Sequence, residues 1–237
     1  MTNIAIIPAR GGSKRIPRKN VLEFAGQPMI AYAISAARSS GLFQHVVVST
    51  DDDQIAETAL RYGAEVPFSR PAELADDHTP TVPVIAHAVA ACAALGWDFG
   101  NVCCIYPAVP FLQTDDMTAA LNLLEKSAAD YSFPVAEFPS APQRALSRAG
   151  DGTLSPLSPG NELTRTQDLP KAYHDAGQFY WGRKSAWLTN PRIHSAGVGH
   201  VIPSWRVVDI DTPDDWRRAE VIHRALFSRS NQRGSEK

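Results

Sequence analysis

Residues 3–20 read NIAIIPARGGSKRIPRKN, and this stretch decides the fold. The apolar run from Asn3 to Pro8 predicts a buried strand, and a loop rich in glycine and basic residues follows it as far as Asn20. In α/β folds, ligands bind beyond the carboxyl ends of the strands. The loop is therefore expected at the edge of the sheet where a protein of this class binds its ligand.

The loop has the composition of a triphosphate-binding site. Gly11 and Gly12 let main-chain N–H groups approach an anion closely. A departing pyrophosphate needs neutralisation by cations. The pattern is neither a Walker A loop nor the G-x-G-x-x-G of a Rossmann dehydrogenase. Its position after a buried strand argues against the alternative, a basic loop that is merely solvated. Five cations fall within ten residues: Arg10, Lys14, Arg15, Arg18 and Lys19.

The first half of the chain then alternates between strand and helix patterns. Further strands are expected at residues 45–50 and 101–106, and a short one ends near Ser69. This alternation is typical of an α/β fold, with a mostly parallel sheet and helices on both faces. Helices are predicted over residues 28–40, 51–62, 81–95 and 115–127.

Residues 131–179 break this alternation. Prolines are frequent there, residues 150–152 read GDG, which signals a turn, and no long helical period is present. We interpret the stretch as an irregular insertion within a single domain of residues 1–237, with a return strand at 178–181. Because it is too irregular to form a core of its own, we expect it to pack on a second subunit as a dimerisation lobe.

Two carboxylates end another expected strand, at residues 205–211, before a final helix at 214–227. Asp209 and Asp211 are two residues apart, so on a strand their side chains point to the same face. Such a pair suits Mg²⁺, which takes one or two carboxylates together with phosphate oxygens. The alternative is that Asp211 caps the final helix while Asp209 bonds to the backbone.

Composition restricts the class of protein. The 237 residues carry a net charge of −2, which gives no general attraction for nucleic acid. No apolar run reaches the length of about 18 residues that a membrane span needs, and no signal peptide is evident. The three cysteines are interpreted as buried, reduced thiols. A cytoplasmic protein is therefore expected, with a frayed polar tail from Ser228.

Several motifs resemble one known family. Residues 7–20 are similar to the signature of the CMP-sialic acid synthetase (acylneuraminate cytidylyltransferase) family. So are VSTD at 48–51, RPAELA at 70–75 and DIDTP at 209–213, in the family's order. The resemblance covers almost the whole chain. It implies a Rossmann-like nucleotidyltransferase that joins CTP to a nine-carbon keto-acid sugar and releases pyrophosphate.

A finer resemblance concerns the sugar. AYHDAGQFYW at 172–181, QRAL at 143–146 and TQDL at 166–169 look like the pseudaminic acid cytidylyltransferase branch. The sialic acid branch usually has Arg-Pro-Asn-Gly where this chain has HDAG, and a Gln where Tyr106 stands. The resemblance therefore implies CMP-pseudaminic acid as the product, for glycosylation of surface glycans or flagellin.

The resemblance also implies roles for single residues. Asp209 and Asp211 would hold Mg²⁺, with Mn²⁺ as a substitute, and would be catalytic together with Arg10 and Lys19. The partners would be CTP, a nonulosonic acid and a second subunit in a homodimer. The nucleotide would be bound by Arg10, Gly11, Gly12, Ser13, Lys14, Lys19, Asn20, Arg70 and Thr81, and the sugar by Tyr106, Arg144, Arg165, His174, Asp175 and Gln178.

Other assignments stay open from the sequence alone. His174 is also compatible with a core histidine bonded to the backbone. One alternative enzyme is an N-acylneuraminate (sialic acid) cytidylyltransferase, and another is a Kdo cytidylyltransferase of the same fold. A different class of protein is a catalytically inactive sugar-nucleotide-binding module. The presence of Arg10, Lys19, Asp209 and Asp211 argues for the enzyme, because an inactive relative is expected to lose at least one of them.

Overall fold

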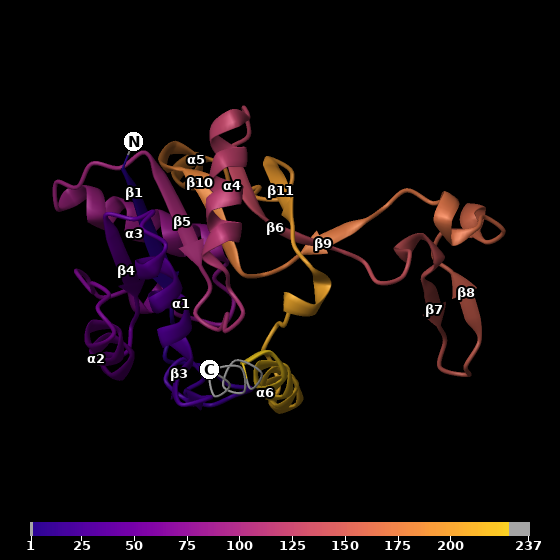
Figure 1. Ribbon diagram of the computed structural model, residues 1–237, viewed down its shortest axis with the longest axis horizontal. Coiled ribbons are helices and arrows are strands. Elements are labelled where there is room, and N and C mark those ends of the chain that lie inside the picture. The colour runs from indigo at the N-terminus through magenta and orange to yellow at the C-terminus, as the bar shows by residue number, and fades with distance from the viewer. Residues whose placement is uncertain (1, 228–237) are drawn as a thin grey trace, which may run out of the picture.

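A seven-stranded sheet forms the centre of the molecule in this computed structural model, which describes residues 2–227. The strand order is β11-β6-β10-β5-β1-β4, and β9 pairs with β6 beside that path (Figure 1). The strands are β1 (Asn3–Pro8), β4 (His45–Ser49), β5 (Asn101–Ile105), β6 (Tyr131–Glu137), β9 (Tyr173–Asp175), β10 (Phe179–Arg183) and β11 (Gly197–Val201).

The sheet is mostly parallel, as the sequence predicted. Strand β1 pairs in parallel with β4 and β5, and β11 pairs in parallel with β6. Strand β10 is antiparallel to both β5 and β6, and β9 is antiparallel to β6. The carboxyl ends of β1, β4, β5 and β6 therefore meet at one edge, from which the basic loop leaves.

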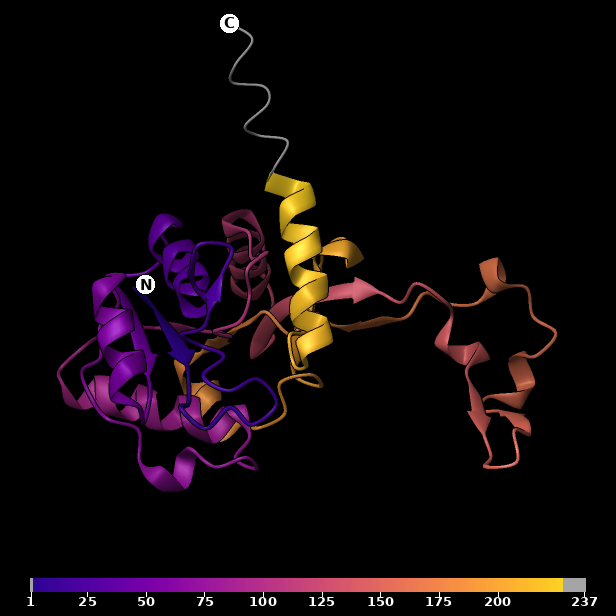
Figure 2. The ribbon, with the colours of Figure 1, turned by 90° about the horizontal axis from the view of Figure 1, so that it is seen from below.

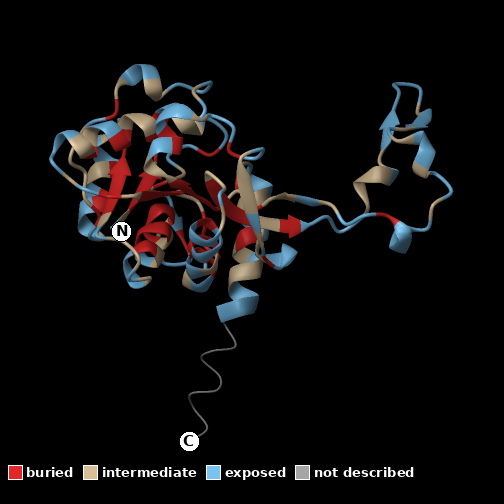
Figure 3. Ribbon diagram, turned by 90° about the horizontal axis from the view of Figure 1, so that it is seen from above, coloured by how far each residue is buried: buried red, intermediate tan, exposed pale blue. Residues whose placement is uncertain are grey.

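Helices cover both faces because neighbouring strand residues point to opposite sides of the sheet. Ala5 and Ile7 pack with α1, α2 and α4, whereas Ile4 and Ile6 pack with α3 and α5. The buried residues form a continuous red interior in Figure 3. The helices are α1 (Met29–Ser39), α2 (Asp53–Arg61), α3 (Thr81–Ala94), α4 (Thr114–Lys126), α5 (Lys184–Thr189) and α6 (Pro213–Phe227).

A third, smaller apolar cluster joins the two ends of the chain. Ile16 of the basic loop and Ile210 pack there with Ala219 of α6. Phe24, on the hairpin of β2 (Glu23–Phe24) and β3 (Gln27–Pro28), meets Trp216 of α6 edge to face at 5.3 Å. The cluster thus fixes α6 across the base of the basic loop.

Residues 138–172 form an arm that stands away from the body (Figures 1 and 2). Strands β6 and β9 make its two-stranded base, and a hairpin of β7 (Leu146–Arg148) and β8 (Leu154–Pro156) lies near its tip. The arm is shorter than the expected insertion of 131–179, because both flanking strands belong to the sheet. Short 3-10 turns occur at Ala72–Leu74, Pro142–Arg144, Pro159–Asn161, Thr166–Asp168 and Ser204–Arg206.

The prediction of a strand at 205–211 was wrong. The chain instead makes the 3-10 turn Ser204–Arg206 and then runs without regular structure to α6. The edge position beside β6 is taken by β11, whose glycines gave little strand signal. Gly197 and Gly199 are needed because a Cβ would come within 2.5 Å of Phe133 and 2.9 Å of Val135. The short strand near Ser69 is only a single bridge between Val47 and Glu65.

The three cysteines are buried and free, and neighbouring Cys103 and Cys104 point to opposite faces of the sheet. Burial raises the pKa of Cys92 to about 11 and that of Cys103 and Cys104 further still. None of the helices within residues 2–227 has both the length and the apolar character to cross a bilayer. The expected frayed tail from Ser228 lies outside the described residues.

Candidate functional site

The basic loop lines a cleft of about 180 Å³ at the carboxyl edge of β1. Of the residues predicted to bind the nucleotide, Arg10, Ser13, Lys14, Lys19 and Asn20 line this cleft, together with Asp211 from the other end of the chain. Gly11, Gly12, Arg70 and Thr81 are not among its lining residues. The cleft therefore combines a cationic wall with one carboxylate. Its lining residues are Pro8, Arg10, Ser13, Lys14, Arg15, Ile16, Lys19, Asn20, Pro107 and Asp211.

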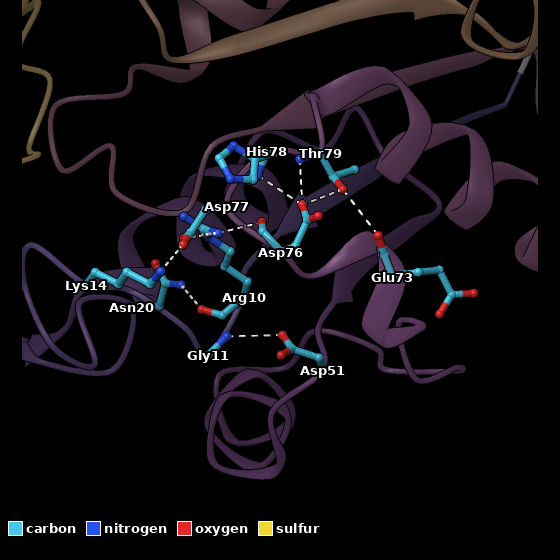
Figure 4. Close-up of polar contacts among 10 residues, drawn as sticks. All are labelled: Arg10, Gly11, Lys14, Asn20, Asp51, Glu73, Asp76, Asp77, His78 and Thr79. Atoms are coloured by element: carbon cyan, nitrogen blue, oxygen red, sulfur yellow. Dashed lines mark hydrogen bonds and ion pairs between the residues drawn. The ribbon is translucent and has the colours of Figure 1, made fainter.

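Main-chain contacts fix the course of the loop. Asn20 is buried and its Nδ2 donates to the carbonyl of Arg10 at 3.0 Å, which closes the loop on itself. Gly11 N donates to Asp51 Oδ1 at 3.1 Å, and a Cβ on Gly11 would meet Asp52 at 2.7 Å (Figure 4). Glycine is therefore required at position 11, whereas a Cβ on Gly12 would meet open space.

Carboxylates already neutralise most of the loop's cations. Arg10 Nη1 lies 2.7 Å from Asp77 Oδ1, and Lys14 contacts the other oxygen of the same carboxyl group (Figure 4). The hydrogen bond from Lys14, assisted by Arg10, lowers the pKa of Asp77. Arg18 differs from the other cations, because it turns away to bind Asp52 and does not line the cleft. Asp77 thus holds the place that an anionic ligand would take.

The predicted acidic pair lies on the irregular run before α6. Lys19 Nζ donates to the carbonyl of Ile210 at 2.6 Å and lies 3.3 Å from Asp211 Oδ1. Arg15 Nη2 lies 2.8 Å from Asp211 Oδ2. Asp209 makes no ion pair with any residue in the described chain, and partial desolvation, followed by the charge of Asp211, raises its pKa. The two acids therefore differ, since only Asp211 is neutralised.

A divalent cation fits this donor set. No group of three or more metal-ligating side chains occurs within residues 2–227. Mg²⁺ does not need one, because it keeps several waters and uses one or two carboxylates plus substrate phosphates. The pKa of Asp209 is raised, first by partial desolvation and then by the nearby charge of Asp211, and a cation between two such acids would favour their ionised forms. Asp209 and Asp211 are the residues that could hold it.

Arg70 and Thr81 flank the segment that carries Asp77. Arg70 is 5% exposed, and its guanidinium donates to the hydroxyl and the carbonyl of Ser49, so it anchors the segment to the end of β4. Burial lowers the pKa of Arg70 to about 10. Thr81, at the start of α3, shares a hydrogen bond of 2.8 Å with the hydroxyl of Tyr106. Thr81 thus lies beside the predicted sugar residue Tyr106.

A second cavity, of about 510 Å³, lies next to Tyr106 and Thr81. Asp175, on β9, accepts a 2.7 Å hydrogen bond from the hydroxyl of Tyr180, and its Oδ2 lies 2.7 Å from His194 Nε2. Burial and the neighbouring Tyr106 and Asp175 raise the pKa of Tyr180. The lining is mainly apolar with a few polar groups, as in sites for small molecules. Tyr106, Tyr180 and His194 face this cavity.

The remaining sugar candidates lie apart from that cavity. His174 Nδ1 bonds to the backbone oxygen of Asp175 at 2.9 Å. Gln178 is 4% exposed, and its amide donates to the carbonyl of Arg206. Arg144 and Arg165 are on the arm, where they contact Thr166 and Asp168, far from the basic loop of their own chain (Figures 1 and 2).

Sequence reasoning missed three residues of the site. Asp77 belongs to an acidic pair that follows the family-like RPAELA stretch, and that placement was a usable signal. Tyr180 lies within the AYHDAGQFYW stretch that resembles the pseudaminic acid branch, so a signal was present for it as well. His194 had none, because only the fold brings the segment after α5 against Asp175 of β9.

Comparison with known proteins places the chain in a family. The Cytidylyltransferase family profile matches residues 4–187. A pseudaminic acid cytidylyltransferase of Campylobacter jejuni is 40% identical over 94% of this chain and 97% of its own. A CMP-N,N'-diacetyllegionaminic acid synthase of Legionella pneumophila is 31% identical over 94% and 96%.

A solved structure shares the fold. The CMP:2-keto-3-deoxy-manno-octonic acid synthetase complexed with CTP superimposes with a TM-score of 0.71, at 15% identity, over 96% of this chain and 100% of that one. The family prediction made from the motifs is thus confirmed. A family profile that spans most of the sheet, together with relatives that align along nearly the whole chain, shows that this protein belongs to the cytidylyltransferase family.

Proposed function

We propose that this protein transfers the cytidylyl group of CTP to pseudaminic acid, giving CMP-pseudaminic acid and pyrophosphate. The observation that carries the proposal is the contact of Lys19 with Ile210 and Asp211, which sets a phosphate-binding loop against an acidic pair. The choice of sugar is supported by the relative of that name from Campylobacter jejuni, 40% identical along 94% of the chain. The legionaminic acid relative, at 31%, fits less well.

In this reaction an oxygen of the sugar bonds to the α-phosphorus as the bond from that phosphorus to pyrophosphate breaks. The protein's contribution to phosphoryl transfer is positioning and charge stabilisation. Arg10, Ser13, Lys14 and Lys19 would hold the triphosphate and stabilise the leaving pyrophosphate. Asp77 must release Arg10 and Lys14 for this, and exposed ion pairs of this kind contribute little to stability.

The acids Asp209 and Asp211 would hold Mg²⁺ or Mn²⁺ beside the triphosphate. When bound, such an ion neutralises charge on the α-phosphate and makes its phosphorus more electrophilic. Asp211 would then exchange its ion pairs with Arg15 and Lys19 for the metal, which frees both cations for phosphate.

The acceptor sugar would lie at the cavity of Tyr106, Tyr180 and His194. Acyl groups suit its apolar lining, and hydroxyl and amide groups suit the polar cluster around Asp175. Thr81 and Tyr106 would separate the sugar from the nucleoside, while Arg70 acts through its anchoring of the wall to Ser49.

We further propose a homodimer in which the arm closes the partner's site. Arg144 and Arg165 suit the sugar carboxylate, because a guanidinium binds carboxylate with two hydrogen bonds. Both belong to the arm, which stands away from the body of its own chain (Figure 1). The arm also exposes leucines that its own residues leave uncovered, at 56% for Leu154, 65% for Leu157 and 97% for Leu163.

The first test concerns the loop. Arg10→Gln and Lys19→Gln should each lower kcat/KM for CTP. The expected fall corresponds to a loss of about 2–4 kcal/mol of transition-state stabilisation, the scale of losing one preorganised charged donor. Arg18→Gln is the matched control, because Arg18 belongs to the same loop but binds Asp52 outside the cleft. Pyrophosphate release at varied CTP measures the effect. Wild-type kinetics for both cleft variants would reduce the loop to a basic surface.

The second test concerns the metal. Asp209→Asn should abolish turnover and EDTA should do the same to the wild type, with rescue by Mg²⁺ or Mn²⁺. Because the pKa of Asp209 is raised, its ionised form destabilises the fold above that pKa, so Asp209→Asn should keep or raise Tm at neutral pH. Asp214→Asn is the matched control, an exposed acid on α6 paired with Arg217. Full activity in EDTA would contradict the metal assignment.

The third test concerns assembly. Light scattering should show a dimer at micromolar concentration, and Leu157→Asp should shift it toward monomer with loss of activity. Mixing an Arg144→Gln chain with an Arg10→Gln chain should restore part of the activity, since a mixed dimer has one site with both an intact loop and an intact partner arm. Leu60→Asp, also exposed but on α2, is the control. A fully active monomer would refute the proposal.

The fourth test concerns sugar choice. With equimolar pseudaminic and N-acetylneuraminic acids and excess CTP, mass spectrometry should find CMP-pseudaminic acid in excess. Hydrophobic fit alone gives about 10- to 200-fold discrimination, whereas unpaired buried polar groups give about 10⁴-fold. Asp175→Ala should weaken use of pseudaminic acid while the KM for CTP stays unchanged. Equal yields would overturn the choice of sugar and leave the cytidylyltransferase in place.

A further inference from the structure

The run that carries Asp209 has an unusual support. From Val208 to Asp211 no main-chain group bonds to another main-chain group within the described chain. In a strand, main-chain hydrogen bonds to the neighbouring strand would fix the position of an acid. Here side-chain contacts must fix it. At the far end of the run, Lys19 binds the carbonyl of Ile210 and Asp215 accepts from the amide of Asp211 at 3.2 Å.

At the near end, Gln178 fixes the main chain of Arg206. The side-chain amide of Gln178 donates to the Arg206 carbonyl at 2.9 Å. The main-chain oxygen of Gln178 in turn accepts from Tyr106 N at 2.9 Å, so the residue is tied to the end of β5. Gln178 is 4% exposed, and this burial leaves its side chain little freedom. A group fixed to the centre of the sheet therefore holds the chain three residues before Asp209.

Asp116 fixes the side chain of the same arginine. Its carboxylate, 8% exposed, accepts from both terminal nitrogens of Arg206, one of them at 3.2 Å. His200 Nε2, from β11, lies 3.1 Å from Asp116 Oδ1. Arg206 is thus held at its carbonyl by Gln178, which immediately precedes β10, and at its guanidinium by the first turn of α4. The irregular run begins from a point that two elements of the body fix.

We propose that Gln178 and the Asp116–Arg206 ion pair are positioning residues that hold Asp209 where the reaction needs it. The inference rests on the proposed function, in which Asp209 binds the metal. A displacement of about 1 Å in such a site costs about 10²-fold in rate, and supporting groups around a metal ligand are worth about 10- to 100-fold in affinity or activity. Gln178 would accordingly act through the acid, and not on the sugar.

The test uses the full chain with two variants. Gln178→Met keeps the size of the side chain and removes the donor to Arg206, and Arg206→Lys keeps the charge but loses the two-nitrogen contact. Each should lower kcat about 10- to 100-fold, with both KM values within about twofold of wild type. Mn²⁺ binding to the enzyme with CTP and no sugar, measured by electron paramagnetic resonance, should weaken over the same range.

Thr58→Val is the matched control, because it removes a buried donor to the Gln54 carbonyl on α2, away from the cleft. It should lower Tm without changing kcat or Mn²⁺ binding. If Gln178→Met raises the KM for the sugar and leaves Mn²⁺ binding intact, Gln178 contacts the sugar and the inference is overturned. The inference is also overturned if both variants have a lower Tm but unchanged kcat and Mn²⁺ binding, as expected for the control.

The reference variant Asp209→Asn separates this inference from the function itself. Full turnover by Asp209→Asn would contradict the proposed role of the acid, and with it the positioning role. If Asp209→Asn is inactive while Gln178→Met and Arg206→Lys match the wild type in kcat and Mn²⁺ binding, only the inference drawn here fails. Circular dichroism confirms that each variant is folded before its kinetics are compared.

Discussion

The ammonium group of Lys19 joins the first loop of the chain to its last segment. It reaches across nearly the whole sequence to the carbonyl of Ile210 and the carboxylate of Asp211. The apolar cluster of Ile16, Ile210 and Ala219 packs alongside this contact. Without this link the phosphate loop would still leave the edge of the sheet, but no contact from the loop would hold Asp211 against it. The active cleft therefore exists only in the completed chain.

The cations of the cleft already form ion pairs that phosphate groups could replace. Asp77 neutralises Arg10 and Lys14, and Asp211 neutralises Arg15 and Lys19, so the cationic wall is compensated before any nucleotide arrives. Phosphate oxygens offer the same chemistry as these carboxylates with more charge. Binding then replaces one set of ion pairs by another, which limits the desolvation cost of gathering four cations in a small volume.

The apolar pattern of the sequence was enough to predict the parallel strands of the first half of the chain. The strands at Asn3–Pro8, His45–Ser49 and Asn101–Ile105 were predictable, because buried parallel strands are continuous apolar runs. Arg10 and Lys19 could be placed at the ligand-binding edge, since their loop follows the parallel strand β1. Asp211 was placed beside them on a strand that does not form, so only the family resemblance supported that part of the site.

The wrong predictions concern segments whose structure depends on contacts with residues far away in the sequence. Residues 205–211 were predicted as a strand, yet the edge of the sheet is already occupied by β11. The run before α6 is held by Asp116 and Gln178, which lie about 90 and 30 residues earlier in the sequence. No spacing rule connects such partners. For the same reason His194 could not be assigned to the neighbourhood of Asp175.

The buried cysteines have a practical consequence. Thiolate is the reactive form of cysteine, and in Cys92, Cys103 and Cys104 both burial and a raised pKa suppress it. The folded protein therefore offers almost no background to thiol-directed dyes at neutral pH. A single cysteine introduced on the arm, and a second on the body, could be labelled selectively in the natural sequence background. The distance between arm and cleft would then be open to measurement by energy transfer during turnover.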